Sequence, residues 1–199
     1  MGSLRASSGP LTTQYLRAVS ENPVDSPHAC SGHATDTFAG IGKAVANLSL
    51  GGPPSMAANQ AAAAAVEAGL FLAVAAGNDG TIARLYSPAS EPTVCTVAAS
   101  DIEDMRANFS NFGGSVDVFA PGVDILSAWN TGRADTNTIS GTSMATPHVA
   151  GLAAYLLALE GSCLPQALCE RIRSLATRDV IKEPGPFSPN LLAFNGVTR

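Results

Sequence analysis

Two apolar segments that flank an alanine-rich stretch constrain the fold of this chain more than any other feature. Residues 44–50 read AVANLSL and residues 70–76 read LFLAVAA, which is the near-continuous apolar composition of strands in a parallel sheet. Between them, Ser55 can cap a helix that runs through the alanines and stops at Gly69. Because both links are short, this pattern predicts a right-handed crossover and a parallel sheet buried on both faces.

Similar patterns continue along the chain. Residues 94–99 and 116–119 are apolar and predict two more buried strands. Helices are expected over residues 143–159 and, with proline in its first turn, over residues 165–176. The sequence therefore predicts an α/β fold of three layers with a parallel sheet.

The first forty residues differ from the rest of the chain. Residues 1–40 are mixed and polar, with no helical or strand period, and they stay unassigned. We expect one domain over residues 41–199. Because no strand is predicted before residues 44–50, the sheet is expected to be incomplete at its N-terminal side, with an unpaired edge.

The composition excludes several classes of function. Of 199 residues, 46% are apolar and 14% are charged, which is typical of a globular chain rather than a disordered one. The net charge is −5 and the lysines and arginines are scattered, so no nucleic-acid partner is expected. The longest apolar runs fall short of a membrane span, and the N-terminus has no apolar signal-peptide core. We therefore expect no membrane partner and no signal peptide.

A serine stands where a turn of small residues enters an apolar helix. The segment 141–145 reads GTSMA, so Ser143 lies at a helix N-terminus, where unpaired amides and the helix dipole favour developing negative charge. This is a suitable place for a nucleophile. The alternative from this segment alone is that the Ser143 hydroxyl caps the helix.

An asparagine follows the second apolar strand. Residues 75–78 read AAGN, and Asn78 stands at the carboxyl end of a predicted parallel strand, where open α/β sheets bind ligands. Its amide could donate a hydrogen bond to an oxyanion. The alternative is that Asn78 only tolerates a left-handed turn before Asp79 and Gly80.

Taken together, these segments resemble the subtilisin-like serine proteases, and the proteinase K branch in particular. The likeness covers about residues 42–199, in family order. The segments that carry it are GTSMATPHVAG at 141–151, AAGN at 75–78, SLG at 49–51, YSPASEPTVCTV at 86–97, FSNFG at 109–113 and NLLAF at 190–194. Residues 41–199 are accordingly interpreted as the C-terminal part of a subtilisin-like peptidase domain.

The resemblance implies roles for several residues. Ser143 would attack the scissile carbonyl, and Asn78 and the Ser143 backbone amide would hold the oxyanion. The substrate backbone would pair with Ser49, Leu50 and Gly51. The primary specificity pocket would be lined by Ala75, Ala76 and Gly77. The implied partners are protein or peptide substrates, and the implied state is a monomer.

The resemblance also implies stabilising features and a location. It suggests a structural calcium ion held by the carbonyls of Pro92 and Val94 and the carboxylate of Asp117, and a disulfide between Cys95 and Cys169. The other two cysteines, Cys30 and Cys163, match no family partner. An extracellular location follows from the resemblance alone.

The groups that should activate the serine are not found at family spacing. In subtilisin the catalytic histidine lies about 157 residues before the serine and the aspartate about 189 before it, whereas Ser143 has 142 residues ahead of it. His148 lies in the nucleophile helix and should point away, and His28 lies in a proline-rich loop. The segment 32–35, GHAT, partly resembles the family's Gly-His-Gly-Thr, which leaves His33 as a candidate base.

We therefore expect a serine endopeptidase of the subtilisin type that is inactive or impaired in this shortened form. Two alternatives stay open. The chain could be a non-catalytic binding protein of the same fold. It could also be a truncated gene prediction whose first forty residues are not genuine coding sequence.

Overall fold

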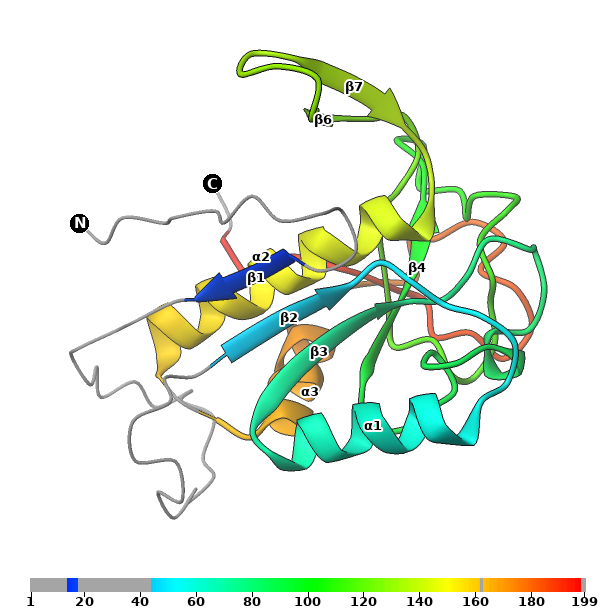
Figure 1. The fold of residues 1–199 in the computed structure, drawn as a ribbon. Coiled ribbons are helices and arrows are strands. Elements are labelled where there is room, and N and C mark those ends of the chain that lie inside the picture. Colours follow the sequence, from blue (N-terminus) through cyan, green and yellow to red (C-terminus); the bar gives the residue numbers. More distant parts are fainter. Residues whose placement is uncertain (1–13, 18–43, 162, 198–199) are drawn as a thin grey trace.

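A seven-stranded sheet forms the centre of the molecule (Figure 1). The computed structural model describes residues 14–17, 44–161 and 163–197. The strand order is β1-β2-β3-β4-β5-β9-β8, and the pairs from β2 to β5 are parallel. The strands of this sheet are β1 (Gln14–Arg17), β2 (Ala44–Leu48), β3 (Leu70–Ala75), β4 (Cys95–Ser100), β5 (Val118–Pro121), β8 (Thr177–Arg178) and β9 (Leu191–Leu192).

The predicted crossover from β2 to β3 is confirmed. Helix α1 (Met56–Glu67) connects two parallel strands whose register runs from Ala44 opposite Leu70 to Leu48 opposite Val74. The hydroxyl of Ser55 accepts a hydrogen bond from the Ala58 amide at 3.2 Å, as expected of an N-cap. Gly69 follows the helix with a φ of 90°, a conformation that glycine adopts without strain.

Helices cover both faces of the sheet, which gives the predicted three layers. Leu72 and Val74 of β3 pack with α1, whereas Phe71 and Ala73 pack with helix α2 (Thr142–Glu160) and helix α3 (Pro165–Leu175). This alternation follows from the period of two along a strand. Helix α2 packs across the same face of β2, β3 and β4 and lies behind them in Figure 1, which places its N-terminal end near the carboxyl ends of those strands.

The N-terminal edge of the sheet differs from the prediction. β1 pairs with β2 in antiparallel register, with Gln14 opposite Asn47 and Arg17 opposite Ala44. The prediction that β2 has an unpaired edge is therefore wrong along this stretch. Edge pairing joins backbone N–H and C=O groups, and it does not require the apolar period that residues 14–17 lack.

A hairpin that the sequence did not predict stands off from the sheet. It consists of β6 (Ile125–Ala128) and β7 (Thr136–Ile139), which pair antiparallel and project from the end of α2 (Figure 1). Most of its residues are exposed, so it shows no clean alternation of buried and exposed positions. A short 3-10 helix (Ala83–Leu85) completes the elements, and β5 begins two residues later than predicted.

The length and apolar character of α2 correct the expectation that no apolar segment is long enough to span a membrane. The helix has 19 residues with a mean hydropathy of 1.2 over an 18-residue window, which by length and composition is enough to cross a membrane. Half of that window is buried inside the protein, where Ala145, Val149 and Ala153 are 0% exposed. The apolar face of α2 is therefore accounted for by its packing against the sheet.

Candidate functional site

Ser143 is the second residue of α2 and does not cap it. The N-cap is Gly141, and no side chain there bonds to the helix amides. The Ser143 side chain is half-buried, and its hydroxyl donates to the backbone oxygen of Ser49 at 3.4 Å. The alternative interpretation of Ser143 as a helix cap is therefore wrong, and its hydroxyl stands at the junction of α2 and the end of β2.

Asn78 is bound to the same turn through its side-chain oxygen. That oxygen accepts hydrogen bonds from the backbone amide and the hydroxyl of Thr142, each at 2.8 Å. These two donors fix which end of the amide is oxygen, so the Nδ2 group points the other way. A methyl group placed on Gly141 would lie 3.6 Å from the Ser143 amide nitrogen and 3.7 Å from Asn78 Nδ2. The two donors therefore flank one small space.

The nucleophile turn and the end of β2 are joined by a second hydrogen bond. Pro147 lies inside α2 and has no N–H to offer the Ser143 carbonyl four residues earlier. The Ser49 hydroxyl donates to that carbonyl at 2.7 Å and accepts from Asn47 Nδ2 at 3.0 Å. The carbonyl left without a helical donor thus holds Ser143 against the segment that follows β2.

The segment Ser49, Leu50 and Gly51 is accessible. Leu50 is 41% exposed and Gly51 is also exposed. Directly after it, Gly52 forms an antiparallel bridge with Ser87, so the chain is already extended at this place. Among the described residues, Leu50 and Gly51 form no backbone hydrogen bonds. Their N–H and C=O groups are free to pair with an added strand.

The predicted pocket residues occupy the end of β3. Ala75 and Ala76 are buried, and Gly77 is partly buried. The Gly77 amide donates a hydrogen bond to the Thr142 hydroxyl at 3.3 Å. The end of β3 and the start of α2 are therefore in direct contact.

A cavity of about 580 Å³ opens on one side of Ser143. Of the predicted site residues, Ser49 and Ser143 line it, and Ala75, Ala76 and Gly77 do not. The remaining lining comes from the β6–β7 hairpin, Asn47 and the first turns of α2. This cavity is therefore distinct from the predicted specificity pocket.

Of the three histidines, His148 lies in the described part of the chain. Its Nδ1 lies 2.9 Å from the Met144 carbonyl oxygen one turn earlier, and the ring is exposed. It lines the cavity beside Ser143 without forming a hydrogen bond to Ser143. The candidate base His33, together with His28 and Cys30, lies outside the described residues.

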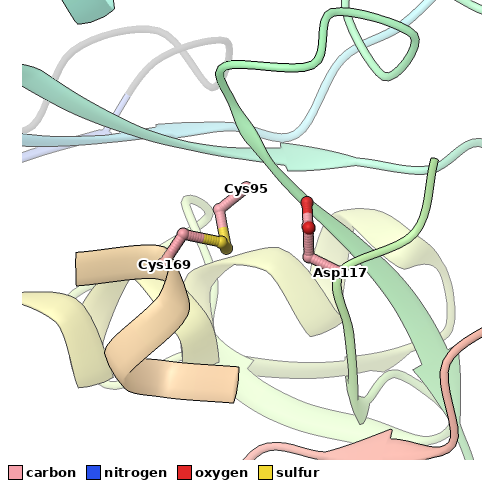
Figure 2. A group of neighbouring side chains, drawn as sticks. All are labelled: Cys95, Asp117 and Cys169. Carbon is pink, nitrogen blue, oxygen red and sulfur yellow. A yellow bond between two sulfur atoms is a disulfide. The ribbon is translucent and has the colours of Figure 1, made fainter. Parts of the chain in front are cut away.

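The predicted disulfide is present. Cys95 on β4 and Cys169 on α3 are joined, with their Cα atoms 5.8 Å apart (Figure 2). The carboxylate of Asp117 lies beside them, so that its oxygen and the two sulfurs fall within 4.8 Å of one another. A metal would need thiolates, and sulfurs bonded to each other do not supply them. This three-residue cluster is therefore not a metal site.

Apart from that cluster, Asp117 offers two carboxylate oxygens. One carboxylate oxygen accepts from the Thr96 amide at 2.8 Å, and the other lies 3.9 Å from the Arg173 guanidinium. Burial raises the pKa of Asp117 to about 6, although the Thr96 hydrogen bond and Arg173 act in the opposite direction. The carbonyls of Pro92 and Val94 accept no hydrogen bond within the described residues. Such oxygens are the donors that calcium prefers.

Three contributors to the site were not singled out from the sequence. Thr142 holds the Asn78 side chain, Pro147 frees the Ser143 carbonyl, and Asn111 bonds to the loop around Asn78. A proline four residues after a proposed nucleophile was a usable signal. The segment 109–113 carries only a family resemblance in the sequence, because the hydrogen-bonding partners of Asn111 are distant along the chain.

Comparison with known proteins gives consistent matches. Residues 19–186 match the model of the subtilase family, a range that includes His33. A cuticle-degrading protease of Metarhizium anisopliae is 57% identical over 153 residues, which are 77% of this chain and 39% of that protein. An alkaline serine protease of Corniculantispora psalliotae is 58% identical over 156 residues, which are 78% of this chain and 40% of that protein.

Solved structures agree with the sequence matches. A cold-adapted subtilisin-like serine proteinase superposes with a TM-score of 0.75 at 41% identity, covering 78% of this chain and 56% of that one. A protease from Pseudoalteromonas arctica superposes with a TM-score of 0.68 at 28% identity, covering 80% and 53%. The chain thus spans about two fifths of the length of the curated relatives it matches.

Proposed function

This chain belongs to the subtilase family, and on that basis we propose that it carries the nucleophile, the oxyanion donors and a substrate-binding strand of a serine endopeptidase. The observation that supports this most is the convergence of three groups at the start of α2. These are the Ser143 hydroxyl, the Ser143 amide and the Asn78 Nδ2 group.

In the proposed reaction, Ser143 Oγ forms a bond to the scissile carbonyl carbon. The carbonyl π electrons move to its oxygen, and the hydroxyl proton passes to a base. Collapse of this intermediate breaks the peptide C–N bond, the amine leaves with a proton, and water later releases the acyl group from Ser143. We do not assign this role to His148, because it forms no hydrogen bond to Ser143 and its Nδ1 contacts the Met144 carbonyl.

The negative oxygen of the intermediate would lie beside Gly141, where the Ser143 amide and Asn78 Nδ2 face one space. Helix α2 contributes the positive end of its dipole at the same point. In subtilisin, loss of the oxyanion asparagine costs about 2.7–4 kcal/mol of transition-state stabilisation. We assign the same role to Asn78.

We propose protein or peptide substrates in extended conformation. The exposed backbone of Ser49, Leu50 and Gly51 would add the substrate as a strand, and Ala75, Ala76 and Gly77 would line the pocket for the side chain before the cleaved bond. The first segment is bonded to Ser143 through the Ser49 hydroxyl, and the second is bonded to the neighbouring Thr142 through the Gly77 amide.

We further propose a structural calcium ion, held by the carbonyl oxygens of Pro92 and Val94 and by the Asp117 carboxylate. When bound, calcium would supply positive charge that stabilises the partly buried carboxylate. An extracellular location and a monomeric state are part of the same proposal. The Cys95–Cys169 disulfide supports an oxidising compartment.

Phosphonylation by a peptidyl fluorophosphonate tests the proposed function. A Ser143 Oγ–P bond forms, the P–F bond breaks, and fluoride and a proton are released. We expect a slow adduct at Ser143 in the folded chain and none there in urea, with Ser143→Ala as the control. Reaction no faster in the folded chain than in urea would instead favour the non-catalytic binding protein.

A further inference from the structure

The loop that carries Asn78 is held by one buried side chain. Asn111 is 0% exposed, and its Nδ2 donates to the Ala76 carbonyl at 2.9 Å. Its Oδ1 accepts from the amides of Asp79 and Thr81, each at 3.0 Å. Asn78 itself is exposed, so the residues on both sides of it are fixed by Asn111 while its own side chain remains available.

The loop backbone is shaped to receive this side chain. Gly77 has a φ of 102°, and a Cβ at this position would lie 2.3 Å from Asn111 Nδ2. Any other residue would therefore be strained and would collide with the Asn111 amide. The Asn111 backbone amide also donates to the Gly77 carbonyl at 3.0 Å. Gly77 and Asn111 thus form one closely fitted unit.

Asn111 is in turn anchored to the centre of the sheet. The neighbouring Ser110 is 0% exposed, and its hydroxyl accepts from the Ala99 amide of β4 at 2.9 Å and donates to the Asn111 carbonyl at 3.1 Å. The Arg106 guanidinium donates to the Ser110 carbonyl at 2.8 Å. A continuous set of hydrogen bonds therefore runs from β4 through Asn111 to the loop around Asn78.

We propose that Asn111 is a positioning residue for the oxyanion site, acting through Asn78. It fixes the turn after β3 so that the Asn78 oxygen meets Thr142 and the Asn78 Nδ2 group faces the space beside the Ser143 amide. This inference rests on the proposed function. Displacement of a catalytic group by about 1 Å costs on the order of 10²-fold in rate, which is the scale on which this role is measurable.

The test uses the full chain with Asn111→Asp. The aspartate keeps an acceptor for Asp79 and Thr81 but places an oxygen against the Ala76 carbonyl. Asn190→Asp is the matched control, because Asn190 holds Ile181 in the same way: its Oδ1 accepts from the Ile181 amide and its Nδ2 donates to the Ile181 carbonyl, each at 2.8 Å. Asn111→Ser, which removes all three side-chain bonds without adding charge, replaces Asn111→Asp if that variant does not fold.

Two readouts are compared. Hydrogen–deuterium exchange followed by mass spectrometry reports the amides of residues 77–81. The rate of phosphonylation of Ser143 by the fluorophosphonate reports the oxyanion site. In Asn111→Asp we expect faster exchange and phosphonylation slowed about 10- to 100-fold, whereas in Asn190→Asp we expect phosphonylation slowed less than about threefold. In the Asn78→Ala background, Asn111→Asp should slow phosphonylation by less than about threefold, because the positioned group is already absent.

Equal slowing by Asn111→Asp and Asn190→Asp overturns the proposal, as does an undiminished effect in the Asn78→Ala background. The proposed function fails separately, if the folded parent chain is phosphonylated no faster than the chain in urea. In that case hydrogen–deuterium exchange still tests whether Asn111 holds the loop. Faster exchange of residues 77–81 in Asn111→Asp supports this contact, and unchanged exchange overturns it.

Discussion

Reduction of the Cys95–Cys169 disulfide should remove a large part of the stability of this fold. The two residues are separated by 74 positions, and the loop-closure estimate for a cross-link of that span is about 4.5 kcal/mol. Folded domains of this size are stable by about 5–15 kcal/mol. Loss of the cross-link is therefore expected to bring the chain close to unfolding.

The expected shift can be measured by urea titration. With a urea m-value of about 2 kcal/mol/M, 4.5 kcal/mol corresponds to a midpoint lower by about 2 M. Far-UV circular dichroism is the suitable probe, because the single tryptophan, Trp129, follows β6 in the projecting hairpin and not in the core. Substituting Cys30 and Cys163 with alanine in both samples prevents exchange of disulfides, and non-reducing peptide mapping confirms the Cys95–Cys169 linkage.

On complete reduction, a urea midpoint that moves by less than about 0.3 M would contradict a stabilisation of this size. Multiplied by the m-value, such a shift corresponds to well under 1 kcal/mol. Free thiols at both Cys95 and Cys169 after air oxidation would contradict the linkage itself.

Three further predictions concern activity, the nucleophile turn and calcium. The 199-residue chain should hydrolyse casein no faster than its Ser143→Ala variant, and steady casein turnover would show that it contains a working base. Ser49→Ala should lower the free energy of unfolding by about 1–2 kcal/mol, because the Ser143 carbonyl loses its donor. Pro147→Ala restores an N–H to that carbonyl and should at least halve the penalty, so equal penalties in both backgrounds, measured by urea unfolding, would disprove the link. Millimolar calcium should raise the melting temperature of the parent chain in differential scanning fluorimetry but not that of Asp117→Asn, and a parent that does not respond speaks against the calcium site.

The parts of the fold that could be predicted depend on local sequence. The apolar strands β2 and β3, the Ser55 cap and the glycine after α1 are all encoded within a few residues of where they act. β1 and the β6–β7 hairpin could not be predicted in the same way. β1 joins the sheet by backbone pairing, and the hairpin exposes most of its side chains.

The residues of the candidate site likewise differ in how far they could be predicted from local sequence. Ser143 and Asn78 could be found because Ser143 stands at the start of a recognisable helix, Asn78 follows a recognisable strand, and both lie in recognisable motifs. The groups that orient them could not, because the contacts cross long stretches of chain. Ser49 and Ser143 are 94 residues apart, and Asn111 and Ala76 are 35 apart. Only the folded sheet brings these hydrogen-bonding groups together.

A structure of the chain with a phosphonyl group attached to Ser143 would show whether the oxyanion site is preformed. The phosphonyl oxygen occupies the place of the oxyanion, and we expect it to accept hydrogen bonds from both Asn78 Nδ2 and the Ser143 amide, at about 2.7–3.1 Å. A phosphonyl oxygen that faces solvent, with Asn78 directed elsewhere, would contradict the claim that this chain holds a preformed oxyanion site.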